Sequence, residues 1–472
     1  MAIWSLDSIF DEARRTVDNW VHLAMDRTVR LAVTGLNQSG KTVFITTLIH
    51  QLLNASRGGR LPFFRVIAEG RFRGAKIIQQ PNLDVSTFRY DQFIRSLTGP
   101  DPSWPQATDG LSEIRLAIRF QPAHFLQRQV QPLVTLYLDI IDYPGEWLLD
   151  LPLLDLSFEA WSAQVLKLCE FEPRAGLARD WLDYLHRLDP NRTAEEEIIR
   201  TASALYTQFL LACKEPRAGL NYLQPGRFLI PGELRDTPLL AFCPLPVSGE
   251  SRYPGSYHEA MNQRFNSYRD RVVRAFYHTH FSRFDRQIVL VDPLKGLNAG
   301  FGAFSDMEKT LHSILGSFNY GPSGILYRLL KPRIDKLLFA ASKVDHVAAN
   351  QHHNLERMLE RLVAMPTNDA LFQGVAVKTM ALSSVRCTET VVREHDGRRL
   401  SFVKGIPKDQ DEEVLLYPGE IPETLPDPAD WSRDRFNFME FRPPRGIELK
   451  DGVPPHIHLD QALEYLLGDK LH

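Results

Sequence analysis

The stretch GLNQSGKT, residues 35–42, directly follows the apolar run VRLAVT, residues 29–34. It fits the pattern G-x-x-x-x-G-K-[ST] of phosphate-binding loops, in which glycines let backbone N–H groups surround the phosphates of a nucleotide. In that pattern Lys41 reaches the β- and γ-phosphate oxygens, and the Thr42 hydroxyl ligates Mg²⁺. The apolar run predicts a buried strand, and TVFITTLIHQLL, residues 42–53, predicts a helix whose N-terminus adds its dipole. The candidate nucleotide-binding residues of this loop are Gly35, Asn37, Gln38, Ser39, Gly40, Lys41, Thr42 and Val43.

A second motif, DYPGE at residues 142–146, ends the apolar run LVTLYLDII, residues 133–141. It fits the D-x-x-G pattern of GTPases, in which a strand-end carboxylate holds Mg²⁺ through water and the glycine N–H contacts the γ-phosphate. We therefore assign Asp142 to the metal and Gly145 to the nucleotide. Glu146 stands where many GTPases place the Gln that orients water. Its carboxylate can orient or deprotonate water, but it also adds negative charge beside the γ-phosphate, so we expect slow turnover.

Two further segments at strand ends are candidates for reading the base. SKVD, residues 342–345, ends an apolar run and resembles the N-K-x-D guanine-reading motif with Ser342 in place of Asn. Asp345 would accept the N1 and N2 protons of guanine, which adenine cannot supply, and Lys343 would lie along the base plane. Because Ser342 removes an amide, adenine stays open as an alternative. A short loop after the next strand stands where a backbone N–H would contact the guanine O6; its residues are Ser383, Ser384 and Val385.

Thr108 precedes the strand-like run RLAIRF, residues 115–120, in an arrangement similar to the switch threonine of heterotrimeric G-protein α subunits. We assign it to sensing Mg²⁺ and γ-phosphate and to the catalytic group with Lys41 and Glu146; an ordinary turn threonine is the alternative. Those α subunits carry an arginine three residues earlier, where this chain has Pro105. The cation that stabilises the transition state is therefore open: an arginine of an insertion, Lys41 alone, or a partner.

The order of strand-like and helical patterns predicts an α/β fold, with a mostly parallel P-loop GTPase-like sheet and helices on both faces. Helical periodicities fill residues 150–285 and predict a large, mainly helical inserted domain. The GTPase domain is then discontinuous, residues 1–149 and 286–472. Within it we expect an amphipathic helix in residues 1–28 and a long switch-I segment at residues 54–114. Charged, turn-rich sequence after Thr388 predicts hairpins at a sheet edge, followed by a short terminal helix.

Bulk properties exclude several classes of protein. The 472-residue chain has a formal net charge of −3, so it lacks a global basic field and we expect no nucleic-acid partner. Its four cysteines form no C-x-x-C pair, which fits a reducing compartment. The acidic N-terminus does not match a signal peptide, and no run of 18 apolar residues occurs. We expect an unprocessed protein with no membrane-spanning helix.

The set GLNQSGKT, DYPGEW and ASKVDHV resembles the TRAFAC-type P-loop GTPases, and over nearly the whole chain it resembles the YcjX-like family of bacterial stress-associated GTP-binding proteins. The resemblance implies GTP and GDP binding, slow Mg²⁺-dependent hydrolysis and a cytoplasmic location. It also implies a protein partner at the inner membrane or in the stress response, which would hold the chain peripheral to the membrane. Two alternatives stay open: an ATP-using P-loop enzyme, and a nucleotide-loaded scaffold with negligible hydrolysis. The sequence does not indicate the oligomeric state.

Overall fold

The structure is a computed structural model of the chain. It describes residues 28–36, 38–57, 60–106, 110–246, 253–319, 334–372, 375–395, 397–433, 436–447 and 452–472. The predicted N-terminal amphipathic helix, Asn37 and Thr108 lie outside these residues.

An eight-stranded sheet forms the centre of the molecule. Its path runs β2 (Phe72–Ile78), β4 (Ser112–Phe120), β5 (Val134–Asp142), β1 (Thr28–Gly35), β6 (Arg286–Val291), β7 (Lys336–Ala341) and β8 (Ala376–Ala381), with β3 (Ser86–Thr87) beside β4. From β5 to β8 every pairing is parallel, whereas β4 runs antiparallel to both β2 and β5. The central strands carry continuous apolar runs because both of their faces are covered. The predicted mostly parallel α/β fold is confirmed.

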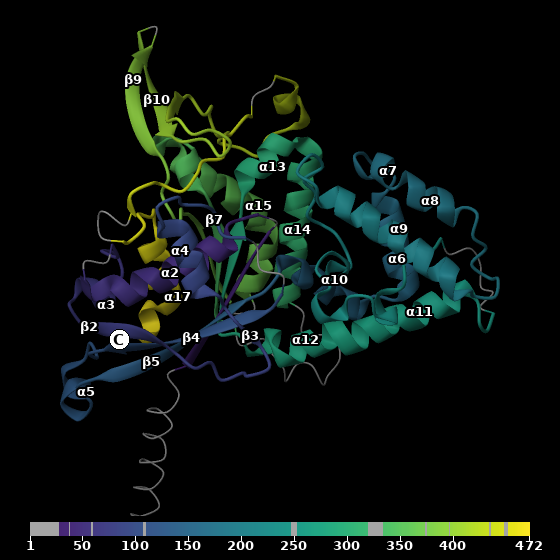
Figure 1. The fold of residues 1–472 in the computed structure, drawn as a ribbon, viewed down its shortest axis with the longest axis horizontal. Coiled ribbons are helices and arrows are strands. Elements are labelled where there is room, and N and C mark those ends of the chain that lie inside the picture. The colour runs from purple at the N-terminus through teal and green to yellow at the C-terminus, as the bar shows by residue number, and fades with distance from the viewer. Residues whose placement is uncertain are drawn as a thin grey trace, which may run out of the picture.

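Helices cover the two faces of this sheet (Figure 1). On one face, α2 (Lys41–Asn54), α4 (Tyr90–Thr98) and α17 (Leu459–Leu467) share an apolar cluster with the strands. On the other face, α13 (Pro293–Ala299), α14 (Phe301–Asn319) and α15 (His352–Phe372) belong to a second cluster. Parallel strands need crossover connections, and α13 and α14 provide the one from β6 to β7, while α15 provides the one from β7 to β8.

A mainly helical segment lies between β5 and β6, where the sequence predicts the insertion (Figure 1). Its elements are η2 (Gly145–Asp155), α6 (Phe158–Leu168), α7 (Arg174–Leu177), α8 (Arg179–Leu185), α9 (Glu196–Lys214), α10 (Gly226–Leu229), η3 (Gly232–Leu234), η4 (Pro238–Leu240), α11 (Tyr257–Tyr268), η5 (Arg269–Val273), α12 (Arg274–Thr279) and η6 (Phe281–Arg283). One apolar cluster joins Ile141 of the sheet, Leu148 of η2 and Trp161 of α6. Because this core is continuous, the domain boundaries at residues 150 and 285 stay a prediction.

Two regions contain further regular elements, and the second of them differs from the sequence-based expectation. The long segment from residue 54 to 114 contains regular elements: η1 (Ala55–Arg57), α3 (Arg65–Ala68), β2, β3 and α4. The strands β9 (Glu389–His395), β10 (Arg398–Gly405) and β11 (Val414–Leu416) form a separate three-stranded antiparallel sheet and do not extend the edge of the main one. Their side chains are largely exposed or half-buried, as expected of strands solvated on both faces.

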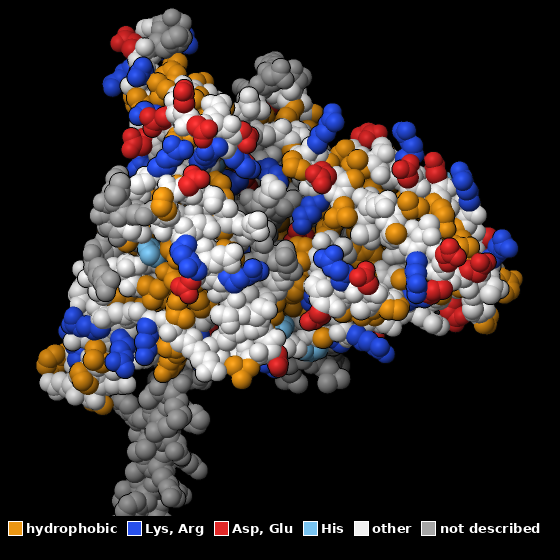
Figure 2. All heavy atoms as spheres, viewed as in Figure 1, with side chains coloured by type: hydrophobic (Ala, Val, Ile, Leu, Met, Phe, Trp, Pro, Cys, Tyr) orange, Lys and Arg blue, Asp and Glu red, His pale blue; other side chains and the backbone are white. Residues whose placement is uncertain are grey.

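Two further features of the molecule are the charges on its surface, which are of both signs, and the apolar character of its helices. On the face shown in Figure 2, acidic and basic side chains are interspersed over the helical insertion at the right. Among the residues that the structure describes, no helix combines the length and the apolar character needed to cross a bilayer.

Leu463 on α17 provides a test of this packing. Its side chain is fully buried in the cluster that joins α17 to the sheet. We expect Leu463→Ala to lower the free energy of unfolding by about 2–5 kcal/mol, because the substitution loses apolar burial and leaves a cavity. Chemical denaturation measures the loss, with Gln461→Ala on the same helix as the control. Equal losses in the two variants would contradict this packing.

Candidate functional site

The phosphate loop lies at the carboxyl edge of the sheet, where β1 ends at Gly35 and α2 begins at Lys41. Gly40 caps α2 with a φ of 83°, a backbone conformation that favours glycine. A Cβ on Gly35 would collide with Ser39 Oγ, and one on Gly145 would collide with the carbonyl oxygen of Gly35. The loop and the D-x-x-G motif therefore touch backbone to backbone.

Lys41 joins these two motifs electrostatically. Its Nζ lies 2.7 Å from Asp142 Oδ1 and donates a hydrogen bond of 2.9 Å to the carbonyl oxygen of Tyr143. Asp142 is buried at the end of β5, and Thr42 is buried in the first turn of α2. Hydroxyl and carboxylate oxygens are ligands that Mg²⁺ prefers. Thr42 and Asp142 therefore fit the metal role that the sequence assigns to them.

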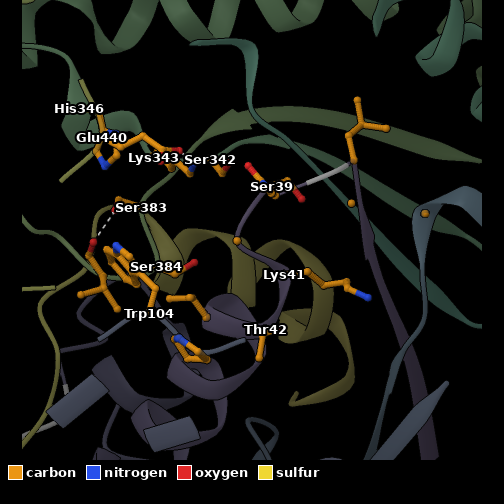
Figure 3. Close-up of a pocket in the computed structure, with 18 of the residues that line it drawn as sticks. Ser39, Lys41, Thr42, Trp104, Ser342, Lys343, His346, Ser383, Ser384 and Glu440 are labelled. Carbon is orange, nitrogen blue, oxygen red and sulfur yellow. Dashed lines mark hydrogen bonds and ion pairs between the residues drawn. The ribbon is translucent and has the colours of Figure 1, made fainter. Parts of the chain in front are cut away.

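A cavity of about 410 Å³ opens beside the loop. This volume lies in the range typical of small-molecule sites. The structure brings nearly all of the predicted nucleotide residues to its wall (Figure 3): Gly35, Gln38, Ser39, Gly40, Lys41, Thr42, Val43, Gly145, Glu146, Lys343, Asp345, Ser383, Ser384 and Val385. Asp142 is not one of the residues that line the cavity, but it forms an ion pair with Lys41, which does line it.

Asp345 lines this cavity and lies in the short helix η8 (Val344–His346) after β7. Its Oδ2 accepts hydrogen bonds from the Cys387 backbone N–H, at 2.8 Å, and from the Cys387 thiol, at 2.9 Å. Its Oδ1 is buried and has no hydrogen-bond partner among the described residues. A buried acceptor left unpaired is costly, so this oxygen suits a ligand that brings N–H donors.

Lys343 lies beside Asp345 with a left-handed φ of 59°. Its Nζ is 2.7 Å from Asp292 Oδ2 and 2.9 Å from Glu440 Oε1. Burial acts to lower the pKa of Lys343, but these carboxylates outweigh it and raise the pKa. Burial likewise acts against ionisation of Glu440, yet Lys343 and Lys408 bring its pKa down to about 2. The ammonium is therefore fixed in its charged form.

Aromatic residues that the sequence did not single out complete the wall of the cavity. Trp104 donates its indole N–H to the carbonyl oxygen of Phe441 at 2.8 Å, and both residues line the cavity. Figure 3 shows Lys343 and Ser342 on one side, with Ser384 and Trp104 across from them. Ser342 donates its hydroxyl to the carbonyl oxygen of Val291 at 3.0 Å, which ties this segment to the end of β6.

Glu146 enters the cavity from η2 and meets a residue of the insertion. The Nζ of Lys214, the last residue of α9, lies 2.7 Å from Glu146 Oε1. Lys214 also lines the cavity. Sequence reasoning missed it because the partners are 68 residues apart and no local pattern marks a lysine at the end of a helix as part of a site.

Comparison with known proteins gives a consistent result. The model of the YcjX-like family, DUF463, matches residues 29–471. A protein of Escherichia coli (strain K12) named Ras-like GTPase YcjX is 42% identical, over 96% of this chain and 97% of its own length. A protein of Shewanella oneidensis with the same name is 38% identical, over 99% of both chains.

The thiol of Cys387 tests the geometry around Asp345. Burial first, and then the Asp345 carboxylate, raise the pKa of Cys387 well above the ordinary thiol value. Because the thiolate is the reactive form, a raised pKa leaves less of it at pH 8 and slows alkylation. Asp345→Asn removes the negative charge and should lower the pKa of Cys387. Alkylation of Cys387 should then speed up by about tenfold for each pKa unit by which the substitution lowers it.

The rate is measured at Cys387 itself by iodoacetamide labelling and peptide mass spectrometry between pH 7 and 10. Asp183→Asn, an exposed carboxylate on α8, is the matched control and should leave the rate unchanged. Rapid labelling of the native protein at pH 7, or no acceleration in Asp345→Asn, would refute the contact.

The same cluster of Asp345, His346 and Cys387 places three ligand atoms within 4.8 Å. The backbone N–H and the thiol of Cys387 both donate to Asp345 Oδ2, so Cys387 orients this carboxylate.

Proposed function

Since this chain belongs to the YcjX-like family, we propose that it binds guanine nucleotides and hydrolyses GTP slowly with Mg²⁺. The names of both relatives support a GTPase, and the motif residues gathered around one cavity support a nucleotide site. The observation that carries the guanine assignment is the buried, unpartnered Oδ1 of Asp345. In this proposal it accepts the N1 and N2 protons of the base.

The proposed reaction is in-line attack of water on the γ-phosphorus. A P–O bond forms to water as the bond to the β,γ-bridging oxygen breaks, and GDP leaves with the electron pair. Lys41 would exchange its contact with Asp142 for the phosphate oxygens, and Glu146 would accept the proton of the water. Mg²⁺ bound by Thr42 and Asp142 would supply further positive charge at the same oxygens. Thr108 stays the proposed switch threonine.

The proposed role is regulatory, in the cytoplasm, with a partner at the inner membrane or in the stress response. This part of the proposal comes from the family resemblance alone. Ser342 in place of Asn keeps an ATP-using enzyme as the competing hypothesis, and the nucleotide-loaded scaffold differs from our proposal only in turnover. Both alternatives are separated by binding and hydrolysis measurements on the purified chain.

Asp345→Asn tests the guanine assignment. We expect calorimetry with Mg²⁺ to show tight binding of GDP and of a nonhydrolysable GTP analogue, with far weaker binding of the ATP counterpart. The substitution should weaken GDP binding about 100-fold or more, because two charge-assisted hydrogen bonds to the base are lost. An amide can donate to the 2-oxo group of xanthine, so XDP should bind the variant better than GDP does.

Asp183→Asn is again the matched control and should leave GDP affinity unchanged. Equal binding of adenine and guanine nucleotides by the native protein would overturn the guanine assignment and reduce the site to a general phosphate loop. Tight guanine binding without any single-turnover hydrolysis would favour the scaffold.

A further inference from the structure

The inserted helices hold Glu146 by its side chain. Lys214 reaches the carboxylate from the C-terminal end of α9 at 2.7 Å, and both side chains are mostly withdrawn from solvent. A half-buried ion pair fixes the position of its members better than an exposed one, since water competes less with the contact. The orientation of Glu146 is therefore set by a residue outside the strands and loops of the nucleotide motifs.

The backbone around Glu146 is held by the same helices. A Cβ on Gly226, at the start of α10, would collide with the carbonyl oxygen of Glu146, so α10 packs directly on this peptide. The Arg227 guanidinium lies 3.4 Å from the centroid of the Trp147 ring. Both contacts come from α10 and touch consecutive residues of η2. This close approach limits the positions that the Glu146 backbone can take.

Asp150, one turn further along η2, is anchored in the same way. Its Oδ1 accepts a hydrogen bond of 2.8 Å from the Gly226 N–H, and its Oδ2 accepts one of 2.5 Å from the hydroxyl of Tyr268 on α11. Asp150 and Tyr268 are both buried. Three helices of the insertion, α9, α10 and α11, therefore contact the segment from Glu146 to Asp150.

The distribution of cations in the cavity gives Lys214 a distinct place. Among the described residues that line the cavity, the other lysines are Lys41, Lys343 and Lys408. Lys343 and Lys408 both contact Glu440, and Lys41 belongs to the phosphate loop. Lys214 is thus the lining lysine that the insertion supplies. Its Nζ contacts Glu146, the residue that follows the glycine of the D-x-x-G motif.

We propose that Lys214 is the positioning residue for Glu146 in GTP hydrolysis. Its ammonium fixes the orientation of the carboxylate that receives the proton of water, and it offsets the negative charge of that carboxylate beside the γ-phosphate. In this proposal the proton passes from water to Glu146, and Lys214 takes no part in the transfer. The insertion thereby supplies in cis a positive charge, in a chain that has Pro105 where G-protein α subunits carry an arginine. This inference rests on the proposed GTPase function.

The test compares single-turnover GTP hydrolysis by Lys214→Ala, Lys214→Arg and the native protein. We expect the Ala variant to lose about tenfold or more in rate, because a misplaced proton acceptor is costly. The Arg variant should recover at least about half of the native rate, since it restores the charge. GDP affinity, measured by calorimetry, should stay within about twofold in both variants, because Lys214 acts on the γ-phosphate end. Lys167→Ala, an exposed lysine in the last turn of α6, is the matched control.

A double-mutant cycle separates positioning from a merely structural role. Once Glu146→Gln has removed the carboxylate, Lys214→Ala should change the rate by less than about twofold, because its target is gone. Native-like hydrolysis by Lys214→Ala, or rate losses that multiply in the double variant, would overturn the inference. Loss of GDP binding in Lys214→Ala that Lys214→Arg does not restore would also overturn it. Native protein that binds but does not hydrolyse GTP would instead refute the proposed function.

Discussion

The parallel pairing of β1 with β5 and β6 is the constraint on which the rest of the site depends. In register, Val33 lies opposite Asp142 and Gly35 opposite Leu290, so both neighbours of β1 end beside the phosphate loop. The carboxyl ends of parallel strands meet at one edge of a sheet, and crevices at that edge are where ligands bind in such folds. Segments distant in sequence thus reach one cavity through backbone hydrogen bonds, before any side chain takes part.

Each lysine that lines the cavity contacts one or two carboxylates. Lys41 meets Asp142, Lys343 meets Asp292 and Glu440, and Lys214 meets Glu146. Paired charges lose less free energy on burial than isolated ones, so these contacts let several ionised groups share a small volume. For Lys343 and Lys214 these contacts also place the cation before a ligand arrives, whereas Lys41 would have to leave Asp142 to reach a phosphate. Electrostatic stabilisation works best when charges do not have to reorganise during the reaction. Lys41 and Lys343 follow the ends of sheet strands, and Lys214 ends helix α9 of the insertion. The paired carboxylates set where each ammonium group points.

Local patterns in the sequence predict three parts of the candidate site. The phosphate loop, DYPGE and SKVD each sit between an apolar run and a turn or helix, so residue spacing alone identifies Lys41, Asp142 and Asp345. It did not find Trp104, Asp292, Cys387, Glu440 or Lys214. These residues come from strand ends, irregular segments and a helix end whose positions depend on packing across the chain. The strand β2 was missed because its side chains are mostly exposed or half-buried and give no apolar run.

The coupling of η2 to the insertion limits how the site can respond to a nucleotide. Residues 145–155 carry Gly145 and Glu146 into the cavity, and the same segment places Trp147, Leu148, Leu149, Leu151 and Leu153 in the apolar cluster of the inserted helices. Close-packed cores do not deform continuously. A shift of η2 on nucleotide binding would therefore have to move α9 and α10 with it or break the contacts of Glu146 and Asp150. Any movement of Glu146 is by this argument coupled to the packing of α9 and α10.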